Sequence, residues 1–210
     1  MKVVCLADVH GRFDFEVPDG DLLIVAGDFT MGGRVEEIAR FNVWLNKLPH
    51  KHKALVAGNH DWLFEKQPKV AEQMLTDCHY LRDSSVTIDG WKIYGSPWQP
   101  EFCNWAFNLP RGEKLREKWK MIPKDTDILI THGPPMGTLD RARSGAVGCR
   151  DLRDRLKKVR PRLHVFGHIH CCPGLHSEYC AGTMRSHVSV NASVCDENYQ
   201  PTNKPQVVEL

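Results

Sequence analysis

Five short apolar runs, each leading into Asp, Asn or His, are the feature that most constrains the fold of this chain. The runs are rich in β-branched residues and almost continuously apolar, which is typical of strands buried on both faces. They cover residues 3–8, 22–28, 53–61, 127–133 and 163–170. Strands of this kind need other layers above and below them, so the runs predict a layered fold.

Helical patterns separate several of these runs. Residues 36–48 carry apolar side chains three and four positions apart and end at a proline, and residues 113–121 and 150–159 repeat the pattern. Strands and helices therefore alternate, which predicts an α/β fold. Residues 85–94 have Asp-Gly at their centre and are expected to form a β-hairpin, because that pair tolerates the positive φ values of tight turns. The hairpin is a candidate for part of a second sheet.

The composition excludes several classes of protein. The 210 residues fit a single domain, expected over residues 1–210, and 41% hydrophobic with 26% charged residues is a globular composition. The net charge of +2 argues against broad nucleic-acid binding, and no apolar run approaches the roughly 18 residues of a membrane span. The N-terminus enters a strand-like run directly and the eight Cys contain no C-x-x-C pair, so we expect a cytoplasmic protein with reduced thiols.

Polar residues gather where the apolar runs end. They are Asp8 and His10 after the first run, Asp28 after the second, Asn59, His60 and Asp61 after the third, His132 after the fourth, and His168 and His170 after the fifth. In α/β sheets the loops at the carboxyl ends of strands converge, and ligand sites assemble there. We therefore expect one crevice to receive all of these side chains.

A lone His near a strand end is more often a structural side chain than a ligand, so only the coincidence of several such residues at neighbouring strand ends indicates a site. Two carboxylates, one Asn oxygen and four of the five histidines offer seven ligands, which is too many for one tetrahedral ion. They suit two divalent ions about 3.5–4 Å apart, an arrangement that fits in-line displacement at phosphorus. Phosphoester hydrolysis is the predicted reaction.

Five motifs carry a resemblance to a known family. They are D-V-H (8–10), G-D (27–28), G-N-H-D (58–61), T-H-G (131–133) and G-H-I-H (167–170). In order and spacing they closely resemble the calcineurin-like metallophosphoesterases. A narrower resemblance, to the MPPED group of class III cyclic nucleotide phosphodiesterases, covers nearly the whole chain and is carried by residues 94–100, 105–112, 131–135, 191–195 and 200–205.

The resemblance implies a four-layer αββα sandwich of two mixed sheets flanked by helices, the metallophosphoesterase fold, with a dinuclear site at the edge of the sheets. It implies two sets of metal ligands: Asp8, His10, Asp28 and His170 for one ion, and Asp28, Asn59, His132 and His168 for the other. Asp28 is expected to bridge the ions because a carboxylate has two oxygens. Strand-like alternation in G-H-I-H would turn both histidines to one side, with Ile169 facing the core.

The resemblance also places His60 beside the phosphate. We assign His60 and Asn59 to substrate binding, and His60 to catalysis as a general acid or as a stabiliser of transition-state charge. Asp61 is expected either to orient the His60 imidazole and favour its protonated form or to be purely structural. The nucleophile would be a hydroxide bridging the ions, because metal ions lower the pKa of bound water.

The predicted activity is metal-dependent hydrolysis of a small-molecule partner, a phosphodiester such as a 2′,3′- or 3′,5′-cyclic nucleotide. The cofactors would be two divalent ions, with manganese favoured over iron, zinc, nickel, cobalt or magnesium. The alternatives are a phosphomonoesterase or protein phosphatase, a nuclease, and a noncatalytic metal-binding scaffold that binds proteins. The presence of both His168 and His170 argues for a competent enzyme and against the scaffold.

Cys171 and Cys172 depart from the MPPED pattern, which resembles G-H-I-H-E at this point. Together with His176 and Cys180 they leave a zinc knot as a minor alternative. We disfavour the knot because the histidines of G-H-I-H already have roles and adjacent cysteines rarely share one tetrahedral ion. Redox sensitivity near the site is the other reading of the pair.

Two segments break the alternation of strands and helices. Residues 95–111 hold Trp98, Phe102, Trp105 and Phe107, expected to pack as a satellite core or to form a base-stacking wall. Residues 133–148 are rich in Gly, Pro and Arg.

Arginines and glycines lie close to the expected ligands. Arg141, Arg143 and Arg150 either contact phosphate or base or are solvated, the second being favoured. The glycines beside the ligands are expected to be scaffold that permits tight turns and close approach: Gly27, Gly58, Gly133 and Gly167.

Overall fold

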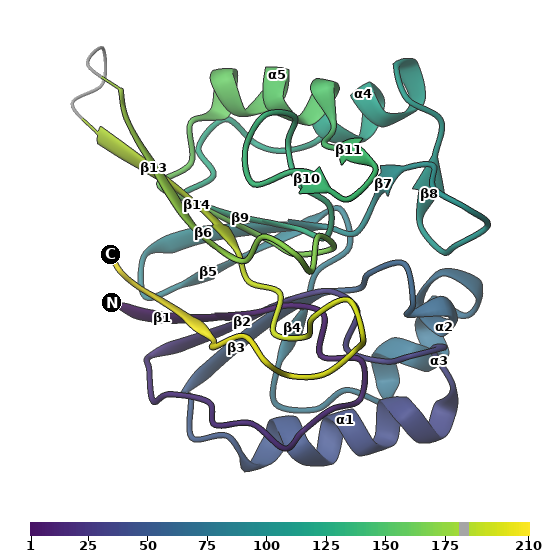
Figure 1. The fold of residues 1–210 in the computed structure, drawn as a ribbon. Helices are drawn as coiled ribbons and strands as arrows, with labels where there is room; N and C mark the ends of the chain where they lie inside the picture. The colour runs from purple at the N-terminus through teal and green to yellow at the C-terminus, as the bar shows by residue number, and fades with distance from the viewer. Residues whose placement is uncertain (181–184) are drawn as a thin grey trace.

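Two mixed sheets lie face to face at the centre of the molecule (Figure 1). The computed structural model describes the backbone of residues 1–180 and 185–210 and the side chains of residues 1–178 and 186–210. The first sheet has the order β15-β1-β2-β3-β4. Its strands are β1 (Lys2–Leu6), β2 (Leu22–Ala26), β3 (His52–Val56), β4 (His79–Tyr80) and β15 (Gln206–Glu209). All pairs are parallel except β15 with β1.

The second sheet has the order β13-β14-β12-β9-β6-β5. Its strands are β5 (Ser84–Ile88), β6 (Trp91–Ser96), β9 (Ile128–Thr131), β12 (Leu163–Phe166), β13 (Gly174–Cys180) and β14 (Arg185–Asn191). The two outer pairs are antiparallel and the inner pairs parallel. Two short pairs lie outside the sheets: β7 (Gln99–Pro100) with β8 (Asn108–Leu109), and β10 (Arg141–Ala142) with β11 (Gly145–Ala146).

Helices cover the outer face of each sheet (Figure 1). On the first sheet they are α1 (Val35–Lys47), α2 (Trp62–Lys66) and α3 (Pro68–Gln73), and on the second α4 (Glu113–Lys120) and α5 (Arg150–Val159). The predicted α/β fold, with two mixed sheets flanked by helices, is confirmed. In the described residues no helix is long and apolar enough to cross a membrane.

Three apolar clusters join the four layers. Alternate side chains of one strand point to opposite faces, so Val3 of β1 joins the cluster between the sheets while Val4 packs toward α1. The cluster beneath the first sheet includes Phe41 of α1, and the cluster above the second sheet includes Trp119 of α4 and Leu152 of α5. Burial on both faces explains why the strand sequences are continuously apolar.

The predicted strands are all present, but each is shorter than its apolar run. The strands end before the polar residues, which lie in the loops that follow. The three predicted helices form within one residue of their expected bounds at either end. The hairpin of β5 and β6 is confirmed, and its turn residues Asp89 and Gly90 have the positive φ values of 46° and 84°.

The two chain termini lie side by side at one end of the sheets (Figure 1), where the amino group of Met1 donates to the carbonyl of Leu210 at 2.6 Å. Strand β1 leaves this end, and β2 and β3 run parallel to it. The carboxyl ends of these strands therefore point to the opposite edge. The loops after β9 and β12 reach the same edge. Their residues His132, His168 and His170 lie close to Asp8 and Asp28, which follow β1 and β2.

Candidate metal centre

Asp8 is fixed directly after β1 by two hydrogen bonds to one of its oxygens. Its Oδ2 accepts from the Ser193 hydroxyl at 2.5 Å and from the His168 backbone N–H at 2.8 Å. Its Oδ1 is buried without a hydrogen-bond partner and lies 3.4 Å from Nε2 of His170. A buried carboxylate oxygen without a donor is costly unless a cation occupies the space beside it, so Asp8 has the form of a metal ligand.

The first group of potential ligands comprises Asp8, His10 and His170, whose ligand atoms lie within 4.8 Å of one another. Nε2 of His10 is 3.3 Å from Nε2 of His170. Nδ1 of His170 lies 2.8 Å from the Asp196 carbonyl and must donate to it, which leaves Nε2 for the centre. Two imidazole nitrogens at this separation need a shared proton or a shared cation between them.

The second group comprises Asp28, His132 and His168. Nδ1 of His132 donates to the Ala26 carbonyl at 2.9 Å, so its Nε2 faces Oδ1 of Asn59 at 2.9 Å and Oδ2 of Asp28 at 3.3 Å. Oδ2 of Asp28 is also 3.9 Å from Nε2 of His10. Asp28 thus stands between the groups, and the structure brings together the seven residues predicted as metal ligands.

The G-H-I-H segment reaches both groups by a route that differs from the prediction. We expected extended backbone that turns both histidines to the same side, but His168 has a φ of 71° and the segment lies outside the strands. Asn191 fixes this turn by donating to the Ile169 carbonyl at 2.8 Å. As a result His168 joins Asp28 while His170 joins Asp8, and Ile169 is buried as expected.

Left-handed backbone is concentrated in this centre. Asp8, His10 and Asp28 have φ values of 55°, 47° and 53°, and His168 shares the conformation. Non-glycine residues adopt this conformation at a cost, and such strain persists only where the surrounding structure enforces it. The strained turns aim side chains from three loops, those after β1, β2 and β12, at one small volume.

The neighbouring glycines make room for these turns. A Cβ on Gly58 would lie 2.2 Å from Oδ1 of Asp28, and one on Gly167 would lie 2.3 Å from Oδ2 of Asp8. Gly27 is equally constrained, since its Cβ would meet the His132 ring at 2.5 Å. Gly133 differs from the expectation, because its nearest neighbour would be Cβ of Gln99 at an ordinary 3.5 Å.

The two carboxylates require positive charge beside them. Burial alone would raise the pKa of Asp8, but the His170 imidazole at 3.4 Å holds it well below its usual value. Asp28 is likewise buried, and its neighbour His132 holds its pKa low. Burial opposes protonation of these two histidines, yet Asp28 raises the pKa of His132 to about 9 and Asp8 raises that of His170 to about 9.

The other two histidines behave in the opposite way. Burial lowers the pKa of both His10 and His168 to about 4, so their imidazoles are neutral at pH 7. Neutral imidazoles and ionised carboxylates are the forms that bind divalent cations. The donor set therefore fits two such ions.

Asp61 does not contact the His60 imidazole, which corrects the orienting role considered for it. Both of its oxygens accept other hydrogen bonds: Oδ2 from the backbone N–H groups of Asp28 and Gly58, and Oδ1 from the N–H and hydroxyl of Thr30, all at 2.7–3.0 Å. Burial and the Asp28 charge raise the pKa of Asp61, while its four donors favour the charged form. Its position is that of a structural tie between the loops after β2 and β3.

His60 lies at the rim of the centre and forms a third group with His10 and Asp28. Its backbone N–H donates to Oδ1 of Asp28 at 2.7 Å, and its Nδ1 donates to the Met31 carbonyl at 2.8 Å. The remaining nitrogen, Nε2, is therefore the one available to a substrate. Trp105 stacks on the ring, with centroids 4.2 Å apart and planes at 30°.

The aromatic residues of the segment 95–111 divide between the two predicted roles. Phe107 is fully buried and packs edge-on against Trp98, as a satellite core would. Trp105 covers His60, and the half-exposed Phe102 lies 6.0 Å from the His168 ring. Two of the four aromatics therefore face the candidate site.

Two residues of the site were not recognised from the sequence. Ser193 holds Asp8, and Tyr199 places its ring 4.7 Å from His10 and 5.7 Å from His170. Ser193 falls within a motif that carries the family resemblance, and Tyr199 immediately precedes another. Their location in or next to these motifs was the only sequence signal that could have identified them.

The zinc knot, the disfavoured alternative, does not assemble in the part of the chain whose side chains are described. Cys171 and Cys172 direct their thiols to the carbonyls of Arg141 and Leu139, at 3.1 and 3.2 Å. His176 instead lies 3.1 Å from Glu178, and the Cys180 side chain is outside the described residues.

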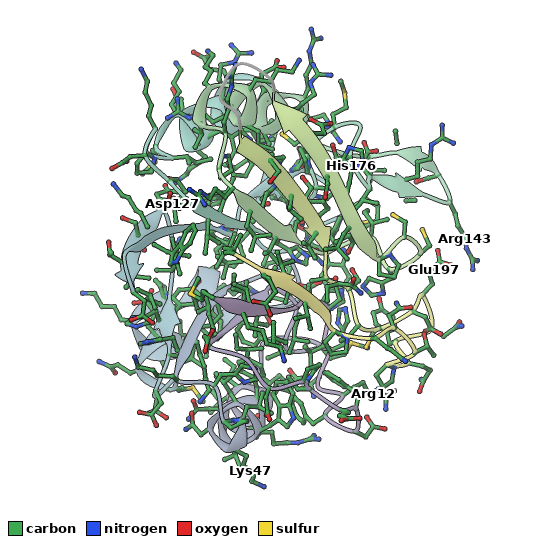
Figure 2. All side chains as sticks on the ribbon, turned by 90° about the vertical axis from the view of Figure 1, so that its left-hand side faces the viewer. Arg12, Lys47, Asp127, Arg143, His176 and Glu197 are labelled. Atoms are coloured by element: carbon green, nitrogen blue, oxygen red, sulfur yellow. The ribbon has the colours of Figure 1, made fainter. Side chains whose placement is uncertain are left out.

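The arginines near the Gly/Pro-rich loop are solvated, which confirms the favoured interpretation. Arg141, Arg143 and Arg150 are exposed. Arg143 pairs with Glu197, which lies next to it in Figure 2. Arg150 lies 4.0 Å from Asp154 within α5.

Comparisons with known proteins agree with this geometry. Residues 1–172 match the family model of the calcineurin-like phosphoesterases. The whole chain is 46% identical to metallophosphoesterase domain-containing protein 1 of Homo sapiens, and of Mus musculus, over 71% of their length. It is also 38% identical, over 99% of its own length and 74% of the relative's, to UPF0046 protein K07C11.7 of Caenorhabditis elegans. The chain therefore belongs to the calcineurin-like phosphoesterase family of metal-dependent hydrolases, in the group of the metallophosphoesterase domain-containing proteins.

Proposed function

We propose that this protein is a phosphodiesterase that binds two divalent ions, manganese in preference, and hydrolyses small phosphodiesters such as 2′,3′- or 3′,5′-cyclic nucleotides. The observation that carries the proposal is the pair of ligand groups, one around Asp8 and one around His132, with Asp28 between them. Two ions bound there would neutralise charge on the phosphoryl oxygens and lower the pKa of the attacking water. The remaining work belongs to the side chains around them.

His60 is proposed to donate a proton to the departing alkoxide. Its Nδ1 is held by the Met31 carbonyl, so a second proton would reside on Nε2, which is the nitrogen left for a substrate. Trp105 covers one face of the ring and limits its rotation. Asn59, placed by its contact with His132, is proposed to bind the phosphoryl group together with His60.

The aromatic residues support a nucleotide as the substrate. Trp105, Tyr199 and Phe102 lie around the rim of the centre and offer faces on which a base can stack. The seven cysteines that can be assessed are all free thiols, which supports our expectation of a cytoplasmic enzyme.

Substrate profiling with Mn²⁺ tests this function. We expect the protein to hydrolyse bis-p-nitrophenyl phosphate and at least one cyclic nucleotide at least tenfold faster than p-nitrophenyl phosphate. A preference for the monoester would instead indicate a phosphatase. Inactivity towards every one of these compounds would leave only a noncatalytic scaffold.

Two variants separate the role of His60 from metal binding. His60→Ala should lower kcat by about 10²- to 10⁴-fold, the usual contribution of a general acid, while the metal content stays near that of the wild type. Asp28→Ala should lose metal and activity together. His176→Ala changes an exposed histidine on β13 and is the matched control, with no effect expected on either quantity.

A further inference from the structure

The small net charge of the chain hides a strongly uneven distribution. Residues 111–122 and 150–160, which comprise α4, α5 and their flanks, hold 11 of the 28 Lys and Arg residues but only four of the 26 Asp and Glu. This helical layer therefore carries a net charge of +7, while the rest of the chain, with 17 cationic and 22 acidic residues, carries −5. The overall net charge of +2 masks this layer, because the compensating acidic residues lie elsewhere in the chain.

A groove lies between the two helices. It encloses about 760 Å³ and is lined by Arg111, Arg116, Lys120, Arg150, Arg155 and Lys158. Two carboxylates also face it, and each has a cationic neighbour. Asp151 lies 3.1 Å from Arg116, and Asp154 lies 3.0 Å from Arg153 and 4.0 Å from Arg150. Lys120 and Lys158 are exposed and form no ion pair with a carboxylate of the described residues.

Two arginines of the groove are held by backbone carbonyls instead of carboxylates. Arg111 donates to the carbonyls of Gly148 and Val147, at 2.9 and 2.6 Å. Arg155 donates to the Ile122 carbonyl, and its buried Nε has no hydrogen-bond partner. Carbonyls position a guanidinium without neutralising its full charge, so both arginines stay available to an anion.

The positive surface continues on the other side of α5. A second cavity, of about 420 Å³, is bordered there by Arg153 and Lys157 of α5, by Arg160 directly after the helix and by Glu178 of β13. Arg153 and Lys157 are four residues apart, which places them on one face of α5, while Arg155 and Lys158 face the groove. Cations on both sides of a helix suit a ligand with several regularly spaced negative charges more than a single small anion.

The exposed apolar residues of the layer distinguish between two polyanions, an anionic membrane surface and a nucleic acid. Membrane-surface helices insert large apolar side chains, but Met121 is the one exposed large hydrophobic residue within the described residues of this layer. The one aromatic residue of the two helices, Trp119, is 1% exposed and so offers no stacking surface for a base. The surface can therefore contact phosphates but not bases.

We propose that the α4–α5 layer is an accessory docking surface for the phosphate backbone of a nucleic acid, which it contacts without base preference. The surface involves none of the metal-centre residues, so the proposal does not depend on the catalytic function. Binding by phosphate contacts alone releases counterions, and log K should fall linearly with log salt. For about four phosphate contacts on a single strand the slope would be about −3.

Fluorescence anisotropy with labelled 20-nucleotide oligo(U) and oligo(A), in EDTA so that the strands stay intact, tests the proposal. Lys120→Glu/Lys158→Glu should weaken binding at least tenfold and halve the salt slope. The matched control is Lys47→Glu/Lys69→Glu, which makes the same change of charge on the opposite helical layer, where Figure 2 shows Lys47. The control should bind within twofold of the wild type, and all variants should hydrolyse bis-p-nitrophenyl phosphate as the wild type does.

Several results would overturn the proposal. One is that the wild type binds neither oligonucleotide at 50 mM salt. Another is that the two double variants lose the same amount of affinity, and a third is a tenfold preference for one base. Binding to phosphatidylserine vesicles without binding to either oligonucleotide would show that the layer serves a membrane instead. Thermal melting checks that each variant is folded, and the milder Lys120→Gln/Lys158→Gln, expected to lose about half of the effect on log K, replaces the charge reversal if that variant unfolds.

Discussion

At the scale of single residues, the candidate centre is built by backbone groups that orient side chains. His60, His132 and His170 each donate from Nδ1 to a main-chain carbonyl, which leaves each Nε2 for the site. Asp8 and Asp61 are fixed by donors from loops distant in sequence. Such partners orient metal ligands and fix their tautomers, so their loss is expected to be felt at the metal.

Ser193→Ala should weaken divalent metal binding by about 10- to 100-fold, the usual effect of losing a partner that orients a ligand. The reason is that Asp8 would lose the hydroxyl that holds its Oδ2 at 2.5 Å. Titration of the apoprotein with Mn²⁺ in a calorimeter measures the change. Ser177→Ala, at an exposed position on β13, is the control, and an affinity unchanged in both variants would refute the role of Ser193.

Asp61→Asn should lower the free energy of unfolding by about 2–4 kcal/mol. Both carboxylate oxygens of Asp61 accept from buried N–H groups, and the NH₂ of an amide would face such donors without being able to accept from them. Urea unfolding measures this loss. Asp14→Asn, at an exposed position, should change stability by less than about 0.5 kcal/mol. If Asp61 instead oriented His60, the variant would keep its stability and lose kcat, which is the contrary outcome.

The identities of the site residues were predictable, but some of their roles were not. Strand ends and motif spacing sufficed to single out Asp8, Asp28 and His132. The role of Asp61 depends on contacts with residues about 30 positions away, which no local pattern encodes. The role of Ser193 was even less predictable, because its hydroxyl donates to Asp8, which lies 185 positions away in the sequence.

At the scale of elements, the loops after the strands need glycine where backbone approaches a ligand. Gly58→Ala should abolish stoichiometric metal binding, because the new Cβ would overlap Oδ1 and the backbone nitrogen of Asp28. Gly133→Ala is the matched control beside His132, where the methyl group meets nothing closer than 3.5 Å. Metal content after desalting distinguishes the two, and equal retention of metal by both variants would contradict this view of the loops.

Secondary structure was predictable where the residue pattern was strong. The apolar runs gave the five central strands, and the Asp-Gly pair gave the hairpin of β5 and β6. Helices α2 and α3 are too short for a clear periodicity, and Pro68 begins the second. The strand β13 was missed because its Cys and His residues suggested metal ligands, and the turn at His168 depends on Asn191 of the neighbouring strand.

At the scale of the whole molecule, the candidate centre depends on both sheets. The loops after β1, β2 and β3 supply Asp8, His10, Asp28 and Asn59, and the loops after β9 and β12 supply the three remaining histidines, His132, His168 and His170. The group around Asp8 and the group around His132 each include residues from both sheets, so neither sheet alone could supply the full set of either. The apolar cluster between the sheets holds the two half-sites in register.

The central claim is that two divalent ions share Asp28 at this junction and make the protein a phosphodiesterase. Metal content per chain, measured by mass spectrometry after Mn²⁺ loading and desalting, tests it when bis-p-nitrophenyl phosphate turnover is recorded on the same sample. We predict two manganese ions per wild-type chain with turnover, and no more than one ion without turnover in Asp28→Ala. A wild-type chain that holds fewer than one ion, or an Asp28→Ala variant that keeps two ions and full turnover, would contradict the claim.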